Sequence, residues 1–108
     1  MNQSVKRIDV KGPPGTWSYE TPNWADCFPI TIGDTYRHGG VSQEPYKSLN
    51  LAFHVGDEPK YVRENRAIIA EYLGVEPARI SCGNQVHGLK AVEIKEDLVG
   101  AGAFGEDT

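Results

Sequence analysis

Three histidines and one arginine are the side chains of this sequence whose chemistry depends most on where the fold places them. His87 follows a short apolar run and precedes Gly88, so we expect its imidazole at the edge of a sheet. An imidazole in such a place suits zinc, which in catalytic sites takes three protein ligands and keeps an open position. A lone histidine after a strand is more often a polar loop residue than a ligand. His38 and His54 are weaker candidates when each is taken alone.

Arg66 is the second candidate because it lies beside the apolar face of a predicted helix. An arginine at such an edge extends to solvent, pairs with a carboxylate or binds an anion. The ion pair is the commoner outcome and the anion site is the functional alternative. Asn65 can donate hydrogen bonds to the same anion or to the backbone.

The elements that position these side chains follow from the hydrophobic pattern. The helix is predicted over residues 58–73, with Asp57 as N-cap, Gly74 after its end and an apolar seam of Val62, Ile69 and Leu73. Short strands are predicted over residues 4–10, 28–32, 49–55 and 80–86, with an extended continuation over 89–95. The dense aromatics Trp17, Tyr19 and Trp24 are expected to pack against a core. The pattern indicates an α+β fold with a mixed sheet and one main helix.

Composition narrows the functional class. Hydrophobic residues make up 39% and charged residues 24% of the 108 residues, and the net charge is −4. This balance, with no basic run, argues against nucleic acid as a partner. No apolar stretch approaches the ~20 residues of a membrane span, and no signal-peptide core is present, so a cytoplasmic location is expected. Cys27 and Cys82 are then expected to be reduced thiols.

Other catalytic motifs are missing from the sequence. It contains no Gly-x-Ser-x-Gly elbow, no Cys-x-x-Cys pair and no phosphate-binding Gly-x-x-x-x-Gly-Lys loop. Cys82 and His87 are five positions apart, so on one strand they would face opposite sides. A nucleophilic cysteine–histidine pair is therefore disfavoured.

Five ordered segments together resemble a known family. They are Arg-His-Gly-Gly-Val-Ser at 37–42, Pro-Tyr and Ser-Leu-Asn-Leu within 45–51, His-Val-Gly-Asp at 54–57, Glu-Asn-Arg at 64–66 and Gln-Val-His-Gly at 85–88. In this order they resemble the N-terminal half of the laccase-domain family, also called multicopper polyphenol oxidoreductases. The family includes purine nucleoside phosphorylases and the peptidoglycan editing factor. Residues 1–108 are accordingly expected to form the N-terminal portion of one such domain, with its C-terminal portion absent.

The resemblance implies a zinc-dependent purine nucleoside phosphorylase. Its substrates would be phosphate and adenosine, inosine, guanosine or methylthioadenosine, with adenosine deamination as a second activity. By position, His87 matches the first zinc ligand, with a catalytic role, and Arg66 matches an arginine that holds phosphate or the substrate anion. His38, Ser42, Asn50 and His54 match motif positions that line the substrate pocket.

The same resemblance indicates what is missing. The family's other two zinc ligands, a cysteine and a histidine, lie in segments downstream of the region that this sequence covers. Ala-Asp-Cys at 25–27 resembles the cysteine segment but precedes the glycine loop, in the wrong order. The 108 residues alone are therefore expected to be inactive, unless self-association or a complementing subunit completes the site. The alternatives are a non-catalytic truncated product or interaction module, a copper-dependent phenol oxidase, and an amidase acting on a peptidoglycan precursor.

Overall fold

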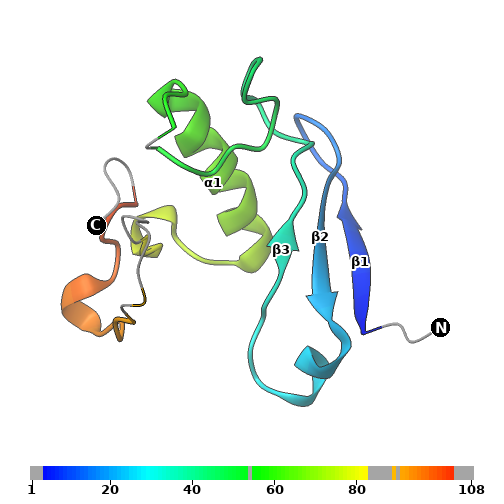
Figure 1. Cartoon of the computed structure of the whole chain (residues 1–108), viewed down its shortest axis with the longest axis vertical. Helices are drawn as coiled ribbons and strands as arrows, with labels where there is room; N and C mark the ends of the chain where they lie inside the picture. The colour runs from blue at the N-terminus through cyan, green and yellow to red at the C-terminus, as the bar shows by residue number, and fades with distance from the viewer. Residues whose placement is uncertain (1–3, 54, 83–88, 90, 104–108) are drawn as a thin grey trace. The chain divides into compact units, whose positions relative to one another are not determined.

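The computed structural model describes residues 4–53, 55–82, 89 and 91–103. The chain forms two compact units, residues 1–50 and residues 51–108. The first unit contains a small sheet, and the second contains the main helix (Figure 1). The α+β class is thereby confirmed.

The first unit is built on a three-stranded sheet in the order β1-β2-β3. Its strands are β1 (Val5–Val10), β2 (Trp17–Pro22) and β3 (Asp34–Thr35). Both pairings are antiparallel, rather than the mixed sheet that the sequence predicts. For β1 and β2 the physical reason is their connection over residues 11–16, which is long enough for a hairpin but too short for the crossover that parallel strands need.

The register of the β1–β2 hairpin gives the sheet two different faces. Ile8 pairs with Tyr19 and Val10 with Trp17, so the apolar side chains share one face. Trp17 is 4% exposed and its ring lies 5.7 Å from that of Tyr19, as expected for core aromatics. Trp24 differs, since it is 52% exposed. It lies in a short 3-10 helix, η1 (Asn23–Cys27), and contacts Phe28 edge-on.

Polar side chains occupy the opposite face of the same hairpin. Arg7 pairs with Glu20, and Asp9 pairs with Ser18. These pairs alternate along the strands with the apolar pairs, so their side chains point to the other face. Ser18 is fully buried although it lies on this face. The polar face is therefore an organised part of the first unit and not only a solvated surface.

Three predicted strands are wrong in the residues that the structure describes. Residues 28–32 contain no strand; Pro29 lacks an N–H, and Ile30 and Ile32 are exposed. Residues 49–53 and 55 are also irregular, because Leu49 N donates to Arg37 O, and Leu51 O accepts from a side chain. Residues 80–82 are not a strand either, and 83–86 lie outside the described residues.

The extended continuation over 89–95 forms no strand where the structure describes it. A 3-10 helix, η3 (Glu96–Leu98), follows it. Another, η2 (Pro77–Arg79), comes between the main helix and residues 80–82. The described residues after the main helix therefore form turns and short 3-10 helices, which the alternating apolar pattern of the sequence does not predict.

The second unit is organised around α1 (Pro59–Leu73), which confirms the predicted helix. The predicted N-cap is wrong by one residue, because the N-cap position is Glu58; Asp57 Oδ1 instead accepts a hydrogen bond of 2.8 Å from Glu58 N. Gly74 ends the helix with φ of 71°, a left-handed conformation that glycine adopts at little cost. No helix among the described residues has both the length and the apolar character to cross a membrane.

The buried face of α1 is narrower and more polar than predicted. Its buried residues are Val62, Asn65, Arg66 and Ala70. Leu73, which the predicted seam includes, is 45% exposed. The seam is displaced because two polar side chains with hydrogen-bonding partners occupy the centre of the face.

Gly39 supplies a direct test of the first unit. Its φ is +93°, and an added Cβ would lie 2.4 Å from Thr16 O and 2.5 Å from Trp17 Cα. We expect Gly39→Ala to lower the free energy of unfolding by at least about 1–3 kcal/mol. The new Cβ would clash with Thr16 and Trp17, and a residue with a Cβ is strained at this positive φ. Gly12→Ala is the matched control, since nothing lies within 4 Å of its added Cβ. Chemical denaturation giving equal stabilities for the two variants would contradict this packing.

Candidate functional site

The glycine loop over residues 37–42 folds back on the segment that follows it. Ser48 N donates to Arg37 O over 2.8 Å, and Ser42 N donates to Ser48 O over 2.9 Å. Gly40 N donates to Ser48 Oγ over 3.1 Å. These bonds join two of the segments that the sequence singles out, 37–42 and 48–51. Ser42 is 2% exposed in this arrangement and Asn50 is partly exposed.

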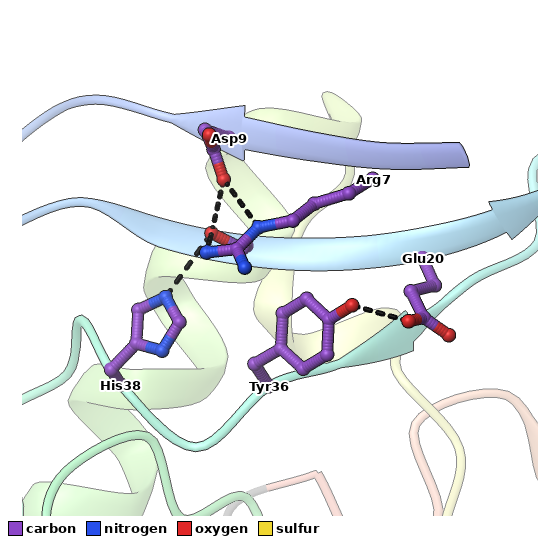
Figure 2. A network of polar contacts seen from close by, with 6 residues as sticks. Arg7, Asp9, Glu20, Tyr36 and His38 are labelled. Atoms are coloured by element: carbon purple, nitrogen blue, oxygen red, sulfur yellow. Dashed lines mark hydrogen bonds and ion pairs between the residues drawn. The ribbon is translucent and has the colours of Figure 1, made fainter.

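His38 is tied to the polar face of the sheet (Figure 2). Its Nε2 lies 3.1 Å from Ser18 Oγ, which donates to Asp9 Oδ1 over 2.6 Å. Arg7 Nη2 donates to the same Ser18 oxygen over 3.3 Å, and Arg7 Nε donates to Asp9 Oδ1 over 3.0 Å. The strands thus position a predicted site residue through a polar chain.

Tyr36 contacts both His38 and Arg7 through its ring. Its ring is stacked on the His38 ring with centroids 6.0 Å apart and planes 15° apart. The guanidinium carbon of Arg7 lies 4.8 Å from the Tyr36 ring centroid, a cation–π distance. The Tyr36 hydroxyl donates to Glu20, and this hydrogen bond raises the pKa of the phenol. The His38 ring is therefore held both at one edge and on one face.

The hydrogen bonds to Asp9 affect its protonation. The Ser18 hydroxyl, followed by the Arg7 guanidinium, lowers the pKa of the Asp9 carboxyl below its ordinary value of 3.8. Asp9 is therefore ionised at neutral pH and can only accept hydrogen bonds.

Arg66 is buried in the second unit, the only buried cation among the residues of that unit that the structure describes. It is 6% exposed, and its Nε donates to Leu51 O over 2.8 Å. Its Nη1 donates to Gly102 O over 2.8 Å and lies 3.5 Å from Ala103 O. The guanidinium carbon lies 4.4 Å from the Phe53 ring centroid. Arg66 therefore joins residues 51–53 to residues 102–103, and its anion-binding role stays a prediction.

Two predicted site residues, His54 and His87, lie outside the described residues. Within residues 4–53, 55–82, 89 and 91–103, no group of three or more histidine, cysteine or acidic side chains could hold a metal ion. Cys27 and Cys82 are not disulfide-bonded; Cys27 is exposed and Cys82 is partly buried. Because a catalytic zinc takes three protein ligands, the described residues do not supply a zinc site by themselves.

The sequence reasoning missed Arg7, Asp9, Ser18 and Tyr36, which surround His38. The signal was present in the hairpin, because the alternation of Trp17, Tyr19 and Thr21 marks a second strand. Pairing that strand with residues 5–10 across the turn places Ser18 opposite Asp9.

The lowered pKa of Asp9 predicts a pH dependence of stability. A carboxyl with a lower pKa in the folded state stabilises the fold fully above its unfolded pKa, and this contribution is lost as the pH falls through the folded value. We expect Asp9→Asn to reduce the loss of stability between about pH 5 and pH 2. The control is Asp97→Asn, a change at an exposed aspartate of η3. Identical acid-unfolding profiles for wild type and Asp9→Asn would contradict the network.

Comparison with known proteins gives a family for this arrangement. A family profile described as multi-copper polyphenol oxidoreductase laccase matches residues 31–107. The purine nucleoside phosphorylase SCO2081 of Streptomyces coelicolor is 55% identical over 57 residues, which are 53% of this chain and 24% of that protein. The purine nucleoside phosphorylase YlmD of Geobacillus stearothermophilus is 35% identical over 95 residues, covering 83% of this chain and 35% of that protein.

The fold agrees with the sequence comparison. The crystal structure of YlmD from Geobacillus stearothermophilus superposes with a TM-score of 0.75 at 29% identity, covering 95% of this chain and 38% of that one. The chain spans between 24% and 35% of the length of the two relatives compared by sequence. Because the profile covers more than half of the residues and contains the glycine loop, α1 and the histidine segment, the chain belongs to the multi-copper polyphenol oxidoreductase laccase family.

Proposed function

We propose that this chain is part of a purine nucleoside phosphorylase. The observation that carries the proposal is the agreement between the family profile and relatives that are themselves purine nucleoside phosphorylases. The reaction splits the bond between ribose C1′ and the base, phosphate adds to C1′, and the base leaves with a proton. Adenosine, inosine, guanosine and methylthioadenosine are the proposed substrates, with deamination of adenosine as a second activity.

Within this proposal zinc is the resident metal and His87 is one of its ligands. Because such a site takes three protein ligands, a cysteine and a second histidine have to come from other polypeptide, either further along a longer protein or in a complementing subunit. Bound zinc would supply a Lewis acid for an oxygen of the reactants or an activated water for deamination. Copper is the alternative metal, and the family's description as a laccase favours testing it.

The chain's own residues have separate proposed tasks. Arg66 binds the phosphate, and the resulting charge neutralisation favours the attack on C1′. Its burial and its contacts with the carbonyls of Leu51 and Gly102 support a fixed position for that charge. His38 and Asn50, with Ser42 and His54, contact the nucleoside. The hydrogen bonds between residues 37–42 and 48–49 support this grouping for the three of these residues in the first unit.

The test is release of free purine from inosine and adenosine by the protein isolated from cells that make it. We expect release that requires added phosphate, with ribose 1-phosphate formed in equal amount. Arg66→Lys keeps the charge but not the planar fork, so it should raise the KM for phosphate at least about tenfold while the KM for inosine changes little. Arg63→Lys, an exposed arginine on the same helix, is the matched control.

Two outcomes would contradict the proposal. Purine release at the same rate without phosphate would indicate a hydrolase, and oxidation of a phenol with bound copper would indicate the older family description. Zinc content supplies an independent readout, because His87→Ala should lower it and added zinc should raise the thermal stability of wild type only. Retention of a full zinc complement by His87→Ala would overturn the ligand assignment.

A further inference from the structure

The Ser18 hydroxyl uses its whole hydrogen-bonding capacity on three charged or titratable side chains. It is fully buried, with Asp9 Oδ1 at 2.6 Å, His38 Nε2 at 3.1 Å and Arg7 Nη2 at 3.3 Å. A serine hydroxyl donates one hydrogen bond and accepts two. With three partners, the Ser18 hydroxyl therefore donates one hydrogen bond and accepts the other two.

The direction of each bond follows from the partners. The Arg7 guanidinium can only donate, so it takes one Ser18 lone pair. The ionised Asp9 carboxylate can only accept, so it takes the Ser18 proton. His38 faces the remaining lone pair and has to donate to it. Nε2 of His38 therefore carries a hydrogen whether the imidazole is neutral or charged.

The consequence concerns the other ring nitrogen. In the neutral imidazole only one nitrogen carries a hydrogen, so Nδ1 is a hydrogen-bond acceptor. Among the described residues, Nδ1 has no hydrogen-bond partner, and the His38 side chain is exposed. Stacking on Tyr36 restricts rotation of the ring about its held edge. The surroundings thus present one defined acceptor atom at the start of the glycine loop.

We propose that Asp9 and Ser18 are positioning residues that hold His38 as its Nε2–H tautomer, so that Nδ1 accepts a hydrogen bond from the nucleoside. The nature of the ligand rests on the proposed function; the tautomer does not. The donor on the ligand is an O–H of the ribose or an N–H of the base. The pairing resembles the way a second residue fixes the tautomer of a working histidine in other sites, with a serine placed between carboxylate and imidazole.

The tautomer is measured without ligand, by long-range ¹H–¹⁵N correlation spectra of His38 in the 108-residue chain. We expect the Nε2–H form to dominate in wild type and the ratio of the two tautomers to fall about fivefold in Asp9→Ala, because Ser18 can then donate to Nε2. Ser18→Ala should lower the ratio in the same direction. Ser4→Ala, an exposed serine just before β1, is the matched control and should leave it unchanged.

Retention of the wild-type ratio in both Asp9→Ala and Ser18→Ala would overturn the positioning role. Asp9 is exposed, so Asp9→Ala keeps the test valid if Ser18→Ala fails to fold. Ligand binding is a separate arm, in which ribose 1-phosphate and adenine are added individually to the isotope-labelled protein as its own cells make it, the same protein that is used for the purine-release test. The proposal is supported if one of the two compounds shifts the His38 Nδ1 resonance and if that shift is at least about fivefold smaller in Asp9→Ala. The compound that causes the shift identifies the donor.

Failure of the two parts can be told apart. A tautomer ratio that responds to Asp9→Ala, with no response of Nδ1 to either compound, overturns the nucleoside contact and leaves the positioning role standing. Phosphate-dependent purine release with an unresponsive tautomer ratio supports the proposed function and overturns this inference.

Discussion

A polar side chain taken out of water costs several kcal/mol unless its hydrogen-bonding groups find partners, and this constraint organises both units of the chain. In the described part of the chain, the buried polar residues are almost as many as the buried hydrophobic ones; they are Ser18, Ser42, Asp57, Asn65 and Arg66. Among the residues that the structure describes, no buried side-chain nitrogen or oxygen lacks a hydrogen bond. Geometry in this chain is therefore specified by directional contacts as much as by apolar packing.

The two clearest cases act on irregular backbone. Arg66 holds the carbonyls of Leu51 and Gly102, which lie in segments without regular secondary structure. In the other unit, Ser18 connects the hairpin to His38 at the start of the glycine loop. Loops carry most binding and catalytic residues but lack the ladder of backbone bonds that orders helices and strands. Side chains anchored on α1 and β2 supply that order here, which suits a site that must hold several groups in fixed positions.

Sequence periodicity predicted the parts of the fold that rest on local signals. The helix over 58–73 has an apolar seam, with Asp57 before its start and Gly74 after its end, and it forms within one residue of those bounds. The strand over 4–10 forms for the same kind of reason. The predicted strand over 49–55 does not form in residues 49–53 and 55, where Leu49 is buried and the carbonyl of Leu51 accepts from the Arg66 side chain and not from a neighbouring strand.

The sequence predicts residues of the candidate site but not the residues and backbone groups that hold them in position. Arg66 and His38 stand out in the sequence because of their positions beside an apolar face and a glycine pair. Asp9 and Ser18 do not, since their role depends on the register of a hairpin, and in the sequence the second strand of that hairpin looks like a cluster of packing aromatics. The carbonyl oxygens that accept hydrogen bonds from Arg66 belong to residues far from it in the sequence. Patterns of neighbouring residues therefore do not predict these contacts.

Hydrogen exchange at the Arg66 side chain tests most directly whether buried polar contacts hold this structure together. The Nε–H of Arg66 donates to Leu51 O in an almost fully buried position. We predict that it exchanges with solvent at least about a hundredfold more slowly than the Nε–H of the exposed Arg63, because exchange requires breaking several charge-assisted hydrogen bonds. Exchange of both groups at the same rate would show that the guanidinium is not held by the backbone carbonyls, and would contradict the account.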